Sequence, residues 1–153
     1  MQTIFDLQAL ADWDAHLPSI IARLRPGSIL ALSGPLGAGK TTFAQKIAAA
    51  LGVQEPVKSP TFALMRTYAL THPILRRLVH VDAYRFETEA EMLALNLAEE
   101  LEVPGTIALI EWPERIPYWL MERADRVHWL TIEPREGERR RVVWEVPERE
   151  ISL

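Results

Sequence analysis

Hydrophobic residues near the start of the chain recur at steps of three and four between Leu7 and Leu24. This spacing is typical of one face of an α-helix, so we expect a helix over residues 7–24. Asp6 is a candidate cap for its first turn. Pro18 is expected to break or kink the helix, and Pro26 followed by glycine ends it.

Three short apolar runs have the pattern of strands that are buried on both faces of a sheet. They occupy residues 28–32, 78–81 and 106–110. Helical spacing returns over residues 43–51, with Gly52 as the stop. Thr88 and Glu91 form a capping-box pattern for another helix that extends to Leu101. Because strands and helices alternate, we predict an α/β fold with a partly parallel sheet.

Two further segments have the pattern of antiparallel strands. Apolar residues alternate with polar ones over residues 62–70, which predicts an extended strand, and residues 71–73 form its turn. Near the C-terminus, residues 127–132 and 142–146 flank a polar turn at 134–137. We therefore expect a C-terminal β-hairpin beside the parallel strands.

The length and composition fit one compact domain over residues 1–153. The chain has a mass of 17.4 kDa and is 48% hydrophobic and 25% charged, which excludes disordered, collagen-like and coiled-coil proteins. The sequence contains no apolar run near the roughly 20 residues that a membrane helix needs. Its first six residues lack the basic and apolar regions of a signal peptide. We therefore expect a cytoplasmic protein without a membrane segment.

Charge and cysteine content narrow the possible chemistry. The chain has no cysteine, and its four histidines do not have metal-ligand spacing, so disulfides, cysteine nucleophiles and a structural zinc are not expected. The net charge of −4 argues against a protein that coats nucleic acid by itself, because phosphate binding draws on clustered positive charge. If the protein contacts nucleic acid, the contact would involve only a small part of its surface or would be made through a partner protein.

A phosphate-binding loop follows the first predicted core strand. Residues 34–41, Gly-Pro-Leu-Gly-Ala-Gly-Lys-Thr, match the G-x-x-x-x-G-K-[ST] pattern between a strand and a helix. In such loops, glycines let successive N–H groups face phosphate oxygens, and the helix dipole adds to the attraction. The Lys40 amine is expected at the β and γ phosphates and the Thr41 hydroxyl at Mg²⁺. Further nucleotide contacts are expected from Leu36, Gly37, Ala38, Gly39 and Thr42.

Two acidic residues end the other core strands. Asp82 follows the apolar run 78–81, and Glu111 follows 106–110. A parallel sheet brings the residues at its carboxyl edge together, so each acid can serve as a magnesium ligand. The spacing alone does not choose between them. The combined pattern predicts a P-loop NTPase-like domain of three layers, with a mixed sheet and the C-terminal hairpin.

Four short motifs together resemble a known family. The phosphate loop, Ser59-Pro60-Thr61-Phe62, the His80-x-Asp82-x-Tyr84-Arg85 segment and Glu111-Trp112-Pro113 occur in the order and spacing of the TsaE (YjeE-like) proteins. These are bacterial P-loop ATPases required for threonylcarbamoyl modification of the adenosine beside the anticodon (position 37) in tRNA. The resemblance covers about residues 27–115.

The resemblance implies a set of roles and partners. ATP would be the nucleotide, Thr41 and Glu111 the magnesium ligands, and Asp82 an acid essential to hydrolysis. It also implies work with TsaD and TsaB, whose complex transfers the threonylcarbamoyl group, so that contact with tRNA would come through the complex. Lys40, Asp82 and Glu111 are thus the candidate catalytic residues.

Other residues leave alternatives open. Thr61 could bring a hydroxyl to the γ-phosphate and magnesium, or belong to a plain proline turn. Arg139, in a basic turn with Arg140 and Arg141, is a candidate arginine finger, although charged turns are usually solvated. Trp112 could lie near the nucleotide or be simply buried, and His80 is expected to be structural.

We therefore expect a magnesium-dependent ATPase that turns over slowly without partners and is monomeric or weakly self-associating. A protein with no assured arginine finger leaves the transition state partly exposed to water, which is why we expect stimulation by a partner. A small-molecule kinase is one alternative, because the loop also suits that class. A nucleotide-dependent assembly adaptor is another.

Overall fold

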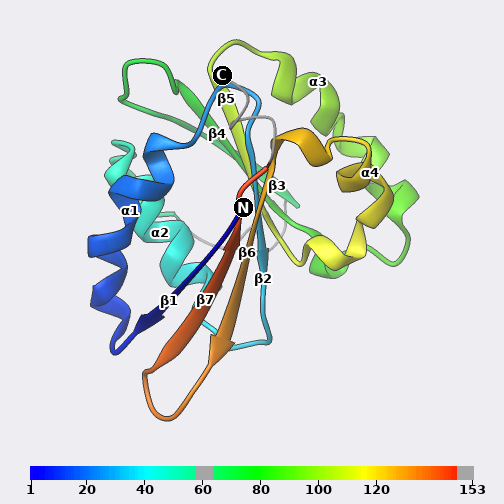
Figure 1. The fold of residues 1–153 in the computed structure, drawn as a ribbon. Helices are drawn as coiled ribbons and strands as arrows, with labels where there is room; N and C mark the ends of the chain where they lie inside the picture. Colours follow the sequence, from blue (N-terminus) through cyan, green and yellow to red (C-terminus); the bar gives the residue numbers. More distant parts are fainter. Residues whose placement is uncertain (58–63, 148–153) are drawn as a thin grey trace.

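All seven strands of the computed structural model, which describes residues 1–57 and 64–147, join in one sheet of order β1-β7-β6-β2-β5-β4-β3 (Figure 1). The strands are β1 (Gln2–Leu7), β2 (Ile29–Ser33), β3 (Met65–Ala69), β4 (Arg77–Asp82), β5 (Thr106–Glu111), β6 (Val127–Pro134) and β7 (Arg140–Glu145). The predicted core strands are thus confirmed. The predicted strand at 62–70 is confirmed from Met65 onward, and its first residues lie outside the described ones.

The sheet is mixed, as predicted. Strands β6, β2, β5 and β4 run parallel in the centre, β3 is antiparallel to β4, and β7 is antiparallel to both β6 and β1. Strands β6 and β7 form the predicted C-terminal hairpin. Because β2, β4 and β5 are parallel, the residues that follow them meet at a common edge of the sheet.

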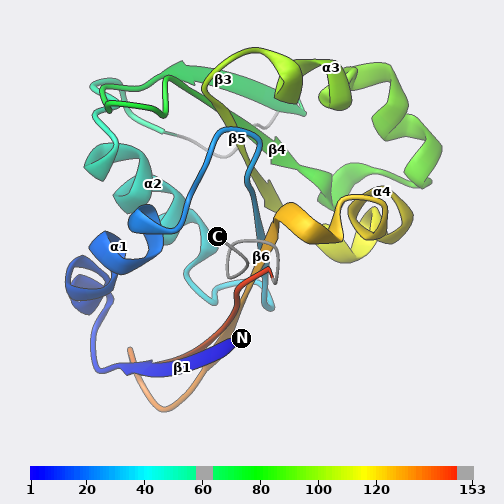
Figure 2. The ribbon, with the colours of Figure 1, turned by 45° about the horizontal axis from the view of Figure 1, so that its top comes forward.

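Helices cover both faces of the sheet, which gives the predicted three layers (Figure 2). One face carries α1 (Trp13–Ala22) and α2 (Lys40–Ala50), and the other carries α3 (Leu97–Glu102) and α4 (Pro117–Met121). In β5, Ile107 and Leu109 join the core beneath α1 and α2, whereas Ala108 and Ile110 join the opposite core. None of the helices within the described ranges has the length and apolar character needed to cross a membrane.

The N-terminal prediction, a helix over residues 7–24 with Asp6 as its cap, is wrong in part, because Asp6 and Leu7 belong to a strand over residues 2–7. Strand β1 pairs along its length with β7, so main-chain bonds to a distant segment override the local helical spacing. Asp6 does not cap a helix, since its carboxylate accepts from Arg141 at 3.1 Å. The helix begins only at Trp13, after a 3-10 turn at Leu10–Asp12, and it continues through Pro18 without the predicted break.

The helix predicted over residues 88–101 is also divided. A 3-10 segment occupies Glu89–Leu95, and α3 begins only at Leu97. Between them Asn96 adopts a left-handed conformation with φ of 53°, which asparagine tolerates better than most residues. The Thr88 side chain makes no capping hydrogen bond, so the capping-box prediction is wrong. Shorter 3-10 turns lie at Ala83–Arg85, Pro113–Arg115 and Ala124–Arg126.

Candidate functional site

The loop between β2 and α2 has the backbone that a phosphate loop requires. Gly34, Gly37 and Gly39 have φ angles of 152°, 78° and 104°, values that residues with a side chain rarely adopt. A Cβ atom on Gly34 would lie 2.7 Å from the Ile132 carbonyl oxygen of β6. The loop therefore bends sharply while it stays packed against the neighbouring strand.

The loop leads into the amino end of an eleven-residue helix. The Phe43 N–H donates to the Gly39 carbonyl at 3.0 Å as the first main-chain bond of α2. The amides of Lys40, Thr41 and Thr42 precede this ladder, and the first amides of a helix have no partner within it. Together with the helix dipole they form a site that attracts anions.

Lys40 is held inside the loop. Its side chain is buried, with 6% of the residue exposed, and its Nζ donates to the Gly34 carbonyl. The same nitrogen lies 3.5 Å from the centre of the Trp112 ring. Burial lowers the pKa of Lys40, and the negative charges of Glu111, Glu114 and Asp82 oppose that shift. The ammonium group is thus placed among carboxylates, a carbonyl and an aromatic ring.

The two candidate acids lie side by side at the carboxyl edge of the sheet. Asp82 and Glu111 are register partners in the parallel pair β4 and β5, and Glu111 is also opposite Leu32 of β2. A carboxylate oxygen of Glu111 lies 2.7 Å from Nε2 of His80, and both side chains are buried. His80 is therefore a structural partner of Glu111, in keeping with the role expected from the sequence.

Asp82 is fixed by the turn that follows it. One of its carboxylate oxygens accepts from the Tyr84 N–H at 3.0 Å. Burial raises the pKa of the Asp82 carboxyl, and the hydrogen bond from Tyr84 opposes this effect, while the nearby Glu111 charge adds to it. Asp82 therefore holds a proton more readily than an ordinary aspartate, a property of acids that exchange protons in reactions.

These groups surround one cavity of about 380 Å³. Its lining includes most of the residues that the sequence pattern selects: Leu36, Gly37, Gly39, Lys40, Thr41, Thr42, Asp82 and Glu111. Ala38 belongs to the same loop, but it is fully buried and does not line the cavity. Thr61 lies outside the described residues. The structure thus brings the loop and the two acids together.

Arg139 lies elsewhere, and its neighbour takes the place next to the loop. Arg139 lines a different cavity, which Asp6, Arg135 and Arg140 also line. Of the two arginines, Arg140 alone also lines the cavity of the phosphate loop, and it donates to the Ala38 carbonyl at 2.9 Å. Sequence reasoning missed this residue, because adjacent positions of the basic turn carry no local signal of which side chain reaches the loop.

Two aromatic residues, Trp112 and Tyr84, form a wall of the cavity, whereas the sequence leaves open whether Trp112 lies near the nucleotide or is simply buried. Trp112 adopts a left-handed conformation with φ of 59°, which places its half-buried ring over Lys40. The Tyr84 ring is tilted against it, with centroids 4.9 Å apart. The Arg115 guanidinium lies over the Tyr84 ring, 5.4 Å from its centre. The strained backbone at Trp112 is the kind of feature that persists at functional sites.

The oxygen groups at the cavity suit a magnesium ion. Within residues 1–57 and 64–147, no cluster of three or more histidine, cysteine, aspartate or glutamate side chains could hold a metal by itself. Magnesium does not need such a cluster, because it binds through one or two carboxylates, waters and substrate phosphates. Thr41, Asp82 and Glu111 line the cavity together, so their oxygens fit this chemistry.

Comparisons with known proteins agree with this architecture. The family described as Threonylcarbamoyl adenosine biosynthesis protein TsaE matches residues 7–142. Proteins named tRNA threonylcarbamoyladenosine biosynthesis protein TsaE include one from Nostoc sp., 44% identical over 98 residues, and one from Bacillus subtilis, 41% identical over 92 residues. These alignments cover 62% and 60% of this chain. They span 58% and 54% of those relatives, which is less than two thirds of their length.

A solved structure extends the likeness to the whole fold. The crystal structure of Bacillus subtilis YdiB superposes with a TM-score of 0.73 at 26% sequence identity, covering 99% of this chain and 90% of that chain. The three layers and the phosphate loop define a P-loop NTPase-like protein. Within that class the chain belongs to the TsaE family, since the family match extends over most of its length.

Proposed function

We propose that this protein binds and hydrolyses ATP with magnesium in support of threonylcarbamoyl modification of adenosine 37 in tRNA. In this proposal it acts in the cytoplasm with TsaD and TsaB, and reaches tRNA through their complex. The observation that carries the proposal is the convergence of the phosphate loop, Lys40 and the acid pair Asp82 and Glu111 on one cavity. Membership of the TsaE family supports the link to tRNA.

Binding would use groups that are already in place. The amides at the start of α2 attract the phosphates, as the first turn of a helix does for anions. Lys40 would exchange its bond with the Gly34 carbonyl for a phosphate oxygen, since the amine already lies within the loop. The Trp112 ring limits the directions in which that amine can move.

Thr41, Glu111 and Asp82 would hold the magnesium ion. When bound, magnesium neutralises the charge that develops on the transferred phosphoryl group. His80 keeps the Glu111 carboxylate in a fixed orientation through their 2.7 Å contact. Asp82, oriented by the Tyr84 N–H, would accept a hydrogen bond from the attacking water or from a water ligand of magnesium.

We expect slow hydrolysis by the isolated protein. The Arg140 guanidinium is engaged with main-chain carbonyls, and Thr41, which lines the cavity, is exposed to solvent. Water-exposed sites stabilise a charged transition state poorly. A partner that covers the cavity or supplies a cation would therefore raise the rate.

The test compares wild type with Lys40→Ala in the presence of TsaB and TsaD. Phosphate release and tRNA modification are measured in the same reactions. We expect the partner-stimulated rate to fall by about 100-fold or more, because a positioned cation at the phosphates is lost. Lys46→Ala is the matched control, since Lys46 lies on the same helix and pairs with Asp14 at the surface.

Equal hydrolysis by wild type and Lys40→Ala would refute the proposed mechanism. Transfer of labelled phosphate to a small molecule would point instead to a kinase. Tight ATP binding with normal tRNA modification but no partner-dependent hydrolysis would point to an assembly adaptor.

A further inference from the structure

One arginine of the C-terminal hairpin reaches into the phosphate loop. The Nε of Arg140, the first residue of β7, donates to the Ala38 carbonyl at 2.9 Å, and its Nη2 donates to the Gly37 carbonyl at 3.3 Å. The loop and the arginine are about one hundred residues apart in the sequence. The contact therefore joins two elements that no local pattern relates.

These bonds set the direction of the loop peptides. In a planar trans peptide, the C=O and the following N–H point to opposite sides. When the Ala38 carbonyl faces Arg140, the Gly39 N–H must face the other way. Gly39 lies on the cavity wall and has a left-handed φ of 104°, and because glycine tolerates many conformations, sterics at Gly39 alone do not fix this peptide.

The arginine is itself anchored in the hairpin turn. Its Nη1 donates to the Gly137 carbonyl at 3.0 Å and to the Arg139 carbonyl at 2.8 Å. The turn is closed by bonds between the main chains of Arg135 and Arg139 and of Arg139 and Glu136. The Arg140 guanidinium thus makes four hydrogen bonds, two to the phosphate loop and two to the hairpin turn. Its planar shape holds these donors in fixed directions, which a lysine amine cannot do.

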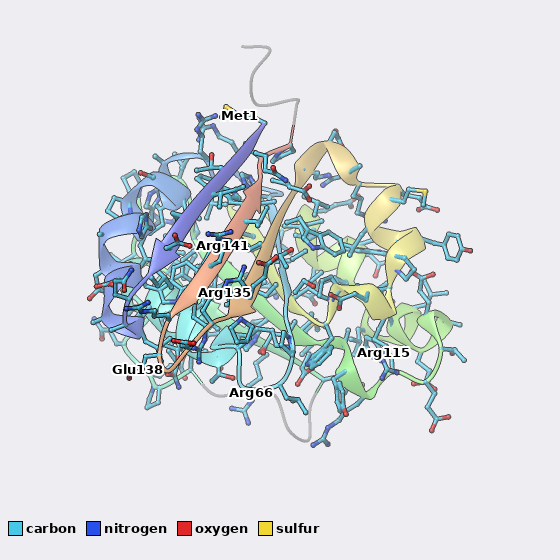
Figure 3. All side chains as sticks on the ribbon, turned by 60° about the horizontal axis from the view of Figure 1, so that its bottom comes forward. Met1, Arg66, Arg115, Arg135, Glu138 and Arg141 are labelled. Carbon is cyan, nitrogen blue, oxygen red and sulfur yellow. The ribbon has the colours of Figure 1, made fainter. Side chains whose placement is uncertain are left out.

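The neighbouring arginines do not share this role. Arg141 is exposed and pairs with Asp6 of β1 at 3.1 Å, and Arg135 pairs with Glu133 at 2.8 Å. Figure 3 shows Arg141 beside β1 and Glu138 at the turn of the hairpin. Arg141 is thus a matched control that differs from Arg140 in its contacts but not in its charge.

We propose that Arg140 is a positioning residue that holds the phosphate loop in its anion-binding conformation. It acts through the carbonyls of Gly37 and Ala38, and it ties the loop to the β6–β7 turn. The proposal rests on the proposed function, since it assumes that the loop receives the phosphates of a nucleotide. The proposal states that the loop conformation requires the several N–H donors of a planar guanidinium, and not only a positive charge, at residue 140.

The test uses Arg140→Gln and Arg140→Lys, with Arg141→Gln as the control. Affinity for ATP with magnesium is measured by calorimetry. Hydrogen exchange of the amides at residues 36–39 is measured without nucleotide, and thermal unfolding shows whether each variant is folded. We expect Arg140→Gln to bind ATP about 10- to 100-fold more weakly, because two bonds from a charged donor to the loop are lost.

The same variants should show faster exchange at residues 36–39, whereas Arg141→Gln should match wild type in both measurements. Arg140→Lys should restore only part of the affinity, because its amine cannot bridge both carbonyls and the turn. Wild-type affinity and exchange in Arg140→Gln would overturn the proposal, and so would complete rescue by Arg140→Lys. If Arg140→Gln does not fold, wild-type affinity and exchange in Arg140→Lys would overturn it.

The two proposals fail in different ways. If wild type does not bind ATP, the proposed function is refuted, yet the exchange measurement still tests the loop contact. If wild type binds ATP and the Arg140 variants bind it equally well, only the role of Arg140 is refuted.

Discussion

Lys40 is surrounded by groups that can each stabilise its charge. The Gly34 carbonyl accepts from its amine, the Trp112 ring lies 3.5 Å away, and Glu111 attracts it electrostatically. Burial acts against all three by favouring the neutral amine. A phosphate in the loop adds a negative charge at short range, so binding would relieve the cost of burying this cation.

Asp82 offers a stability test that does not depend on activity. Burial raises its pKa in the folded protein above the ordinary value of 3.8. The folded state therefore binds this proton more tightly than the unfolded state, and the resulting stability is present at low pH and lost as pH rises through the folded pKa. We predict that Asp82→Asn raises the free energy of unfolding at pH 7.

Urea unfolding of wild type and Asp82→Asn at several pH values measures this difference. The gain should shrink as the pH falls through the raised folded pKa and should be gone below the ordinary aspartate value, where the wild-type carboxyl is protonated in both states. Asp14→Asn is the control, since its side chain is 69% exposed and should change stability by less than about 0.5 kcal/mol. A loss of stability in Asp82→Asn at pH 7 would contradict the prediction.

Residue types at fixed spacing could be predicted from the sequence, whereas contacts between distant residues could not. The loop motif and the acids Asp82 and Glu111 follow from short patterns, and the structure places them at one cavity. Arg140 contacts Ala38 across a separation of 102 residues, and the hairpin turn decides which of its arginines points inward. The position of the Trp112 ring over Lys40 depends on a left-handed backbone at Trp112. No residue pattern around Trp112 predicts this conformation.

At the scale of elements, the phosphate loop depends on how closely β2 approaches β6. A methyl group at Gly34 would meet the Ile132 carbonyl at 2.7 Å and the Ala38 side chain at 3.1 Å. Backbone atoms in a strand cannot move aside easily. We predict that Gly34→Ala lowers the free energy of unfolding by about 1–3 kcal/mol, the usual cost of overpacking, and displaces the loop.

Gly37→Ala provides the comparison. It also has a positive φ, of 78°, but no atom lies within 4 Å of its added Cβ. Gly37→Ala should lower the free energy of unfolding only by the conformational cost of a positive φ, about 1–2 kcal/mol. Gly34→Ala should therefore be the less stable of the two variants in urea unfolding. The reverse order would show that contact with β6 does not constrain the loop.

Hydrophobic spacing predicts some of the helices and strands correctly and others not. It predicts β2, β4, β5 and the final hairpin, because these strands are bounded by glycine, proline or charged residues. It leaves residues 2–5 unassigned and places Asp6 and Leu7 at the start of a helix, because their partner strand β7 is almost the whole chain away in the sequence. It also misses the division at Asn96, since apolar residues on both sides keep a helical period.

At the scale of the whole molecule, the sheet connects every part of the site. Strands β2, β4 and β5 carry the loop and the acids, and β7 carries Arg140. Two apolar cores pack against opposite faces of this one sheet. A disturbance in either core would therefore be transmitted to the edge where the cavity lies.

We predict that residues 1–153 unfold in one cooperative transition that magnesium and ATP shift to higher temperature. A ligand at 100 times its dissociation constant adds about 2.7 kcal/mol of stability, which for a chain of 153 residues corresponds to roughly 5–10 °C in Tm.

The measurement is calorimetry of wild type and Lys40→Ala, with and without nucleotide. Lys40→Ala should keep the single transition and lose most of the shift, because its fold is intact but its loop lacks the amine. Two separate transitions in wild type would refute the single-domain organisation, and an equal shift in both proteins would show that the nucleotide binds away from the loop.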